Sequence, residues 1–129
     1  MKDYSTEDWY KREVEKYISQ YGYVPPQWVV FPNSHPFSMQ WRMGSGETFL
    51  MVFYTWLDKN YNTIEGKIDF FLKNSPPPRW LQVVADSIWS DEVDFEVPFE
   101  ESEYYRKLKD LGFKGVDEFS KDLDDPKWD

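Results

Sequence analysis

Residues 47–57 read Glu-Thr-Phe-Leu-Met-Val-Phe-Tyr-Thr-Trp-Leu, and this stretch decides the fold. Apolar side chains that recur at steps of three and four indicate a helix, and a helix that is apolar nearly all round belongs in a protein interior. We therefore predict a central helix whose Phe49, Phe53 and Trp56 are core residues. Ser45 is its expected N-cap, and the stretch 60–62 is its expected end. The apolar positions are Phe49, Leu50, Val52, Phe53, Trp56 and Leu57.

The same spacing continues on both sides of this stretch. Residues 6–21 carry one apolar stripe, and Gly22 supplies a stop signal for a helix. Toward the C-terminus the spacing predicts short helices over 63–74, 80–89, 101–111 and 116–123. These elements make helix the dominant secondary structure of the chain.

Two segments lack helical spacing. Residues 23–46 contain four prolines and are expected to form a long loop. Within it, Trp28–Phe31 is either a very short strand or an apolar wrap across the core. Residues 91–99 alternate acidic and apolar side chains, which is typical of an extended arm, and Pro98 argues against a central strand.

The predicted fold is mainly α, a single compact domain of about five or six short helices with a long Pro-rich loop and an extended acidic arm. The alternative is an α+β fold in which Val29 and Val93–Val97 pair as a small sheet. We assign residues 1–129 to one domain. Its expected parts are an N-terminal helix (1–22), a neutral aromatic-rich core (23–90) and an acidic arm with the last helices (91–129).

Charge and composition exclude several classes of function. The net charge of the 129-residue chain is −9, and residues 91–129 alone contribute −8, because fourteen acids there oppose six bases. Such a field repels phosphates, so direct nucleic-acid binding is disfavoured. The absence of cysteine excludes thiolate chemistry and cysteine zinc sites, and one histidine argues against a metal centre. We expect no metal and no cofactor.

The sequence also bears on localisation. The first residues carry acids where a signal peptide is apolar, and no apolar run reaches the roughly 18 residues of a membrane-spanning helix. We expect a cytoplasmic protein without membrane contact.

Residues 34–47 are the candidate ligand site. This segment holds the only histidine and an arginine, and its Gly-Ser-Gly turn opens the central helix, whose free amides suit an anion. We favour a purely structural interpretation over ligand binding: the segment is a turn with a helix N-cap, and it lies beside aromatic surface. No nucleophile–base arrangement is recognisable, so we expect no catalytic residue. The candidate ligand-binding residues are His35, Gln40, Trp41, Arg42, Ser45 and Glu47.

The acidic arm is the candidate partner site. Its apolar side chains anchor it either on a basic partner or on the flank of its own helices. The candidate partner-binding residues are Asp91, Glu92, Asp94, Phe95, Glu96, Glu100 and Glu101. Glu65 and Asp69, four apart on one predicted helix, are interpreted as a solvated face.

The function favoured by these observations is a small acidic, non-enzymatic protein-interaction module, such as an adaptor, an inhibitor or an immunity-type protein. Its expected partner is a basic protein, because the field of the chain favours one. Two alternatives stay open. One is a small-molecule or anion-binding protein or enzyme that uses residues 34–47, and the other is an inhibitor that mimics nucleic acid. Self-association, which would bury surplus aromatic rings between subunits, also stays open.

Overall fold

The computed structural model describes residues 3–90 and 96–128, which form helices and short 3-10 turns but no strand. The α-helices of this part are α1 (Asp8–Tyr21), α2 (Gln27–Val30), α3 (Gly44–Asn60), α4 (Ile64–Lys73), α5 (Leu81–Ile88), α6 (Glu103–Asp110) and α7 (Phe119–Leu123). The 3-10 turns are η1 (Met39–Arg42), η2 (Pro78–Trp80), η3 (Phe99–Glu101), η4 (Val116–Glu118) and η5 (Pro126–Trp128). The predicted mainly α class is confirmed.

Contacts along the chain define two compact units, residues 1–62 (unit 1) and residues 63–129 (unit 2). The prediction that residues 1–129 form one domain stays a prediction. Each unit has its own internal packing, described in turn below.

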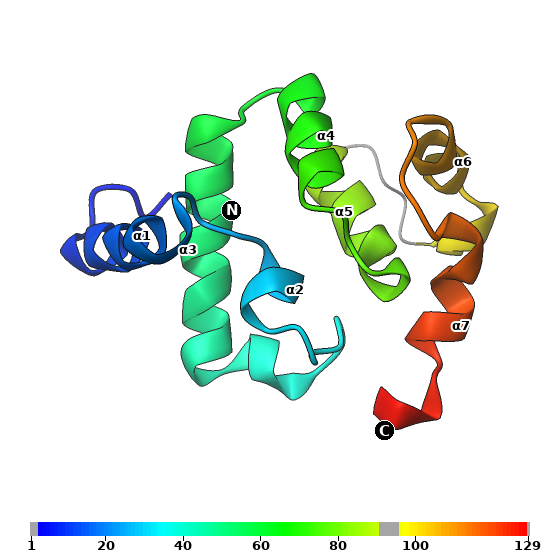
Figure 1. Cartoon of the computed structure of the whole chain (residues 1–129), viewed down its shortest axis with the longest axis horizontal. Coiled ribbons are helices and arrows are strands. Elements are labelled where there is room, and N and C mark those ends of the chain that lie inside the picture. The colour runs from blue at the N-terminus through cyan, green and yellow to red at the C-terminus, as the bar shows by residue number, and fades with distance from the viewer. Residues whose placement is uncertain (1–2, 91–95, 129) are drawn as a thin grey trace. The chain divides into compact units, whose positions relative to one another are not determined.

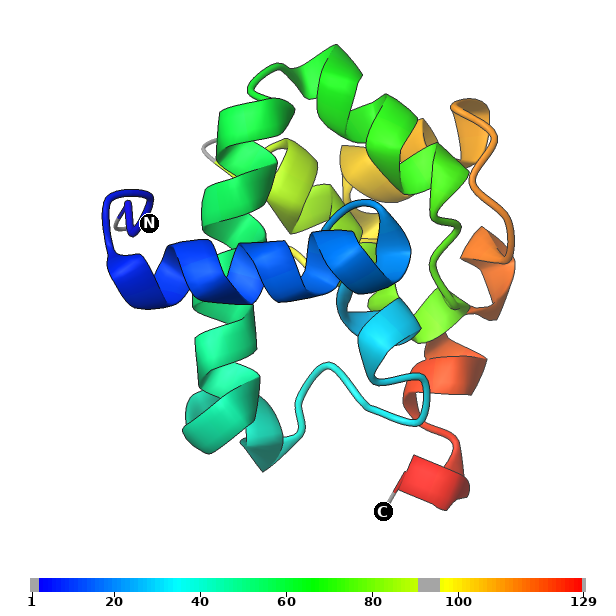
Figure 2. The ribbon, with the colours of Figure 1, turned by 60° about the vertical axis from the view of Figure 1, so that its left-hand side comes forward.

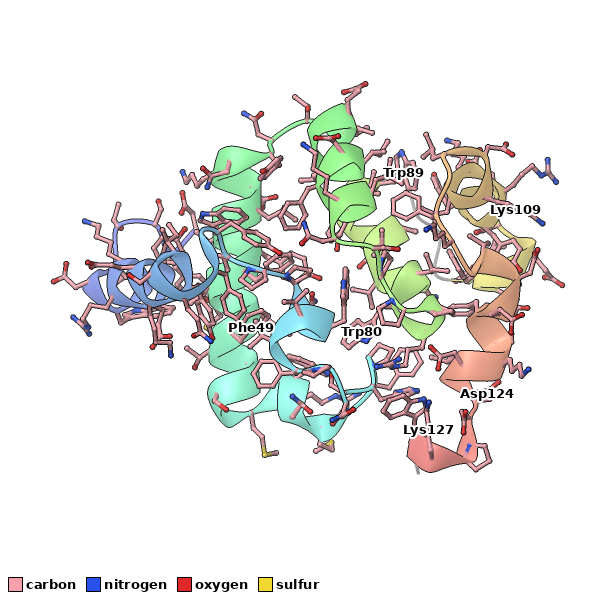
Figure 3. The ribbon with its side chains drawn as sticks, in the orientation of Figure 1. Phe49, Trp80, Trp89, Lys109, Asp124 and Lys127 are labelled. Atoms are coloured by element: carbon pink, nitrogen blue, oxygen red, sulfur yellow. The ribbon has the colours of Figure 1, made fainter. Side chains whose placement is uncertain are left out.

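Unit 1 is organised around α3, as the stretch 47–57 predicts. α1 crosses α3 in Figure 2, and Phe49 of α3, labelled in Figure 3, is 2% exposed. The Phe49 ring lies 5.7 Å from Tyr17 of α1, 5.4 Å from Phe31 and 6.0 Å from Phe53, measured between centroids. Each such pair adds about 0.5–1.5 kcal/mol beyond the burial of its area. Phe49 therefore joins α1, α3 and the segment after α2.

Unit 2 is a series of short helices. α4 and α5 lie side by side in Figure 1, and α5 also contacts α6. The Thr63 side chain caps α4 by accepting a 2.9 Å hydrogen bond from the Gly66 amide. At the end of α5, the Trp89 ring lies 5.3 Å from that of Tyr104 on α6. The apolar side of α5 is buried through Leu81, Val84, Ala85 and Ile88.

Two local predictions are wrong. Residues 27–30 form α2 instead of a strand, so the small sheet that pairs Val29 with the acidic arm is not supported; residues 91–95 of that arm lie outside the described residues. The cause is Pro26, which suits a helix start and whose carbonyl accepts hydrogen bonds from the amides of Val29 and Val30. Ser45 is not an N-cap, because it lies inside the first turn of α3 and Met43 precedes that helix in an extended conformation.

Candidate functional site

The segment between α2 and α3 is held in place by its own hydrogen bonds. The Trp41 indole nitrogen donates to the carbonyl of His35 at 2.9 Å, and the Phe37 amide donates to His35 Nδ1 at 3.1 Å. The Ser38 hydroxyl accepts from the Gln40 amide at 3.3 Å and caps η1. Because these bonds close successive turns, the segment is an ordered structure that connects two helices.

A glycine fixes where this segment meets α3. A Cβ atom added to Gly46 would lie 1.9 Å from the carbonyl oxygen of Gln40, so only glycine allows α3 to approach η1 this closely. Gly44 has a φ of +64°, the left-handed region that favours glycine. Both glycines of the Gly-Ser-Gly turn therefore have structural roles.

The six predicted ligand-binding residues fall into three groups. Trp41 is buried, with its ring 5.4 Å from Phe31 and 6.4 Å from Phe49, so it belongs to the core of unit 1. His35 and Gln40 are half-buried in the turns just described. The remaining three, Arg42, Ser45 and Glu47, are exposed. Ligand binding by these six residues stays a prediction.

The segment also exposes three large apolar side chains. Phe37, Met39 and Met43 are 62%, 57% and 58% exposed, and no other large apolar side chain of the described residues exceeds the 45% of Ile18. We call these three residues the apolar loop surface. This surface was not predicted from the sequence, because the apolar residues between Pro36 and Gly44 follow neither helical nor strand spacing. The available signal was three large apolar residues within seven positions of a turn-rich segment.

The acidic arm is only partly described. Asp91, Glu92, Asp94 and Phe95 lie outside the described residues, whereas Glu96, Glu100 and Glu101 are exposed. The end of the arm is anchored on unit 2 by Phe99, whose ring lies 4.8 Å from Phe119 and 5.6 Å from Tyr105. Glu100 accepts a hydrogen bond from the Ser120 hydroxyl. The arm therefore packs on its own helices at this end, and partner binding by its acids stays a prediction.

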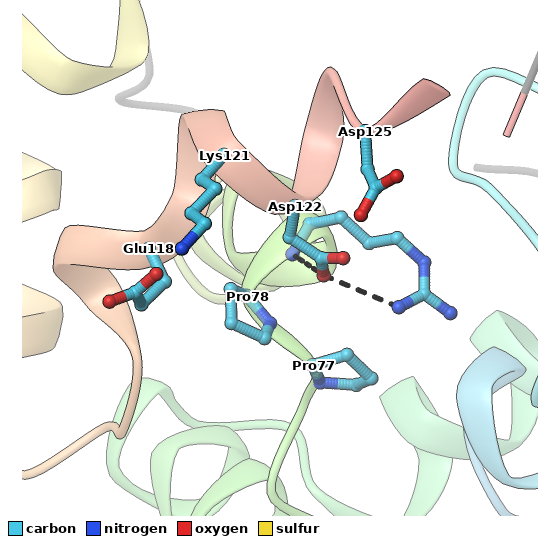
Figure 4. A pocket seen from close by; sticks show the side chains of 7 residues that line it. Pro77, Pro78, Glu118, Lys121, Asp122 and Asp125 are labelled. Carbon is cyan, nitrogen blue, oxygen red and sulfur yellow. Dashed lines mark hydrogen bonds and ion pairs between the residues drawn. The ribbon is translucent and has the colours of Figure 1, made fainter. Parts of the chain in front are cut away.

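Unit 2 contains a pocket of about 390 Å³ between η2 and α7 (Figure 4). Arg79, which is 5% exposed, pairs with Asp122 at 3.3 Å between Nη1 and Oδ2. The same Asp122 oxygen accepts the Arg79 amide at 2.9 Å, and the Arg79 guanidinium lies 4.1 Å from the ring centre of Trp128. The lining residues are Pro77, Pro78, Arg79, Glu118, Lys121, Asp122 and Asp125.

This buried pair fastens α7 to η2. Gly115 also packs closely on this segment, because an added Cβ atom there would lie 2.8 Å from the Pro78 ring. The pair was not predicted from the sequence, because its partners stand 43 positions apart and belong to no recognisable motif. Because the Arg79 guanidinium already contacts Asp122 and Trp128, we assign a structural role to the residues around this pocket.

Hydrogen bonds and burial shift the pKa values of three aspartates in opposite directions. A hydrogen bond from Lys59 holds the pKa of Asp3 in unit 1 well below its usual range, and one from Lys109 lowers the pKa of Asp117 in unit 2. Burial instead raises the pKa of Asp86 on α5. Among residues 3–90 and 96–128, no three His, Cys, Asp or Glu side chains come together as metal ligands.

No helix in this part of the chain has the length and apolar content needed to span a bilayer. Comparisons with protein-family models, with curated proteins and with solved structures find no match to this chain. The functional argument therefore rests on the geometry and charge described above.

Proposed function

We propose that this chain is a non-enzymatic protein-binding module, of the adaptor, inhibitor or immunity type, whose apolar loop surface docks on a basic protein. The observation that carries the proposal is the exposure of Phe37, Met39 and Met43 within seven consecutive residues. Clustered apolar exposure of this kind marks interaction sites, whereas single exposed apolar residues are ordinary. Phenylalanine, methionine and arginine are also enriched at protein interfaces, and the exposed Arg42 stands within the cluster.

The ordered framework beneath the surface supports docking. Association costs entropy for every side chain and loop that must be fixed on binding. Here the hydrogen bonds of Trp41, Phe37 and Ser38 already fix the backbone that carries the three apolar side chains. Burial of one large apolar side chain contributes about 1.5–3 kcal/mol, so these three side chains can supply the central apolar contact of a larger interface.

Charge favours a basic partner. Residues 63–129 contain seventeen acids and nine bases, which gives −8, whereas residues 1–62 contain seven acids and six bases, which gives −1. The acidic unit 2 attracts a positively charged protein and speeds its encounter, and the nearly neutral unit 1 offers apolar contact at low desolvation cost. The two units thus have complementary roles in binding.

The test is capture of proteins from the native cell lysate on the immobilised full chain. We expect the wild type to retain a basic protein and the double variant Phe37→Ser/Met39→Ser to bind it at least about tenfold more weakly, because loss of a hot spot costs 2 kcal/mol or more. The matched control is Ile18→Ser, which removes the next most exposed apolar side chain, on α1. This control should capture as the wild type does.

Two results would contradict the proposal. One is equal retention of the same protein by the wild type and the folded double variant. The other is no retention by a folded wild-type chain. Capture at about 1 M salt, where the Debye length is about 3 Å, separates the roles of the units, because slower association with retained binding is expected if charge only steers the encounter.

A further inference from the structure

Methionine is the only sulfur-containing residue type in this chain. The sequence contains no cysteine and four methionines, so no thiolate competes for a mild oxidant. Met39 and Met43 are 57% and 58% exposed, whereas Met51, on α3, is less exposed. Met1 lies outside the described residues. Among the described methionines, the two that are well exposed therefore both belong to the apolar loop surface.

The reaction that these side chains undergo is oxygen transfer from a hydroperoxide. The thioether sulfur attacks one peroxide oxygen, the O–O bond breaks, and the hydroperoxide leaves as water or an alcohol after a proton shift. The sulfur loses two electrons and the peroxide gains them, which gives methionine sulfoxide. Sulfoxide reductases reverse the step, so the modification can act as a switch.

Oxidation at these positions is expected to change the surface without disturbing the fold. Both side chains already lie largely in water, so the new polar oxygen needs no desolvation in the free protein. The hydrogen bonds that hold the segment come from Trp41, Phe37 and Ser38, and none of those described uses a methionine sulfur. In a complex, however, the sulfoxide would have to be buried against an apolar surface, which disfavours binding.

We infer that Met39 and Met43 are sites of reversible oxidation by hydroperoxides, and that their oxidation releases the docked partner. This inference rests on the proposed function, because it assigns a regulatory chemistry to the same surface. Methionine is common at adaptable binding surfaces, where its flexible thioether suits varied partners. Conversion of two of the three apolar side chains to polar ones should weaken binding at least about tenfold.

The first experiment uses the full chain alone with hydrogen peroxide. Peptide mass spectrometry should find sulfoxide at Met39 and Met43 several-fold sooner than at Met51, with unchanged circular dichroism. The emission of Nile red, a neutral dye that reports apolar surface, should fall on oxidation and recover with methionine sulfoxide reductases. Preferential oxidation of Met51, or loss of the helical spectrum as Met39 and Met43 oxidise, would overturn the inference.

The second experiment measures retention of the protein captured by the reduced chain. The variant Met39→Leu/Met43→Leu keeps apolar bulk without sulfur, so it should bind with or without peroxide, whereas peroxide should abolish binding by the wild type and by Met51→Leu. Equal binding by the reduced and oxidised wild type would overturn the inference alone. Equal binding by the reduced wild type and Phe37→Ser/Met39→Ser would instead reject the proposed function.

Discussion

Residues 1–62 and residues 63–129 are similar in length but differ in what holds them together and in what they present to solvent. Unit 1 carries a charge of −1 and is built around Phe49, whose ring meets those of α1, α3 and the segment after α2. Unit 2 carries −8 and closes its C-terminal part through the buried Arg79–Asp122 pair. Unit 1 also exposes the apolar loop surface.

Under the proposed function, this difference assigns two requirements of binding to different parts of one small chain. Long-range attraction needs a net charge. Unit 2 has one, in addition to the internal ion pair between Arg79 and Asp122. Close contact needs apolar side chains that can be desolvated cheaply, and these stand in unit 1, where little net charge surrounds them. Substitutions in the ion pair therefore test the stability of unit 2, and substitutions in the uncharged packing test the stability of unit 1.

The largest expected effect is in unit 2. Arg79→Ala should lower the free energy of unfolding by about 3 kcal/mol, because removal of one partner leaves the Asp122 carboxylate without its guanidinium in a partly buried site. Urea unfolding measures the change. Lys121→Ala, at an exposed base of the same pocket, should stay within about 0.5 kcal/mol of the wild type.

The double variant Arg79→Met/Asp122→Leu sharpens this prediction. Replacement of a buried ion pair by apolar side chains of similar volume is often neutral, so the double variant should be more stable than Arg79→Ala. A double variant as unstable as the single one would show that the closure depends on the Asp122 carboxylate, which accepts hydrogen bonds from both the guanidinium and the backbone amide of Arg79. An Arg79→Ala variant as stable as the wild type would contradict the claim that unit 2, unlike unit 1, depends on a buried ion pair.

The second effect tests the uncharged packing of unit 1. Gly46→Ala should lower the free energy of unfolding by about 2 kcal/mol, because its Cβ atom would overlap the Gln40 carbonyl, which is backbone and cannot rotate away. Gly44→Ala meets no atom within 4 Å and bears only its strained φ, at a cost of about 1 kcal/mol. Thermal unfolding of both variants measures the order, and a Gly44→Ala variant less stable than Gly46→Ala would contradict the steric explanation.

The sequence predicts some of these features and cannot predict others. Helical spacing is a local property, so α1, α3 and the helices of unit 2 were predicted from residues close in the chain. Trp28–Phe31, which overlaps α2, was expected to be a short strand or an apolar wrap, because four consecutive apolar residues show no period that identifies a helix. The Arg79–Asp122 pair depends on how distant segments meet, and no local pattern encodes such a meeting.

The candidate site shows the same limit. Residues 34–47 were singled out for His35, Arg42 and the Gly-Ser-Gly turn, all of which are polar or turn-forming. Which side chains of this segment face water depends on Trp41, whose indole turns inward to the core and to the His35 carbonyl. The sequence shows that Phe37, Met39 and Met43 are close together in a turn-rich segment, but only the structure shows that these three side chains are exposed while Trp41 is buried.

The smallest expected effect is a pH dependence that separates two acids of unit 2. Burial raises the pKa of Asp86, so between its ordinary value and this raised value the folded state holds more protons than the unfolded state. The free energy of unfolding therefore falls as pH rises through that window. Asp86→Asn lacks this loss, so the variant should match the wild type in acid, gain relative stability through the window and keep a small constant advantage at neutral pH.

Asp117 supplies the control of opposite sign. Its pKa is lowered by the hydrogen bond from Lys109, so its stabilisation is present above the ordinary value and is lost as pH falls through the lowered one. Asp117→Asn should therefore be less stable than the wild type at neutral pH and approach it only in stronger acid, below the window of Asp86. Urea midpoints across the acid range distinguish the two windows. If the advantage of Asp86→Asn were the same at every pH, the burial of its charge would not be the cause, and the stabilisation would have to come from packing of the amide on α5.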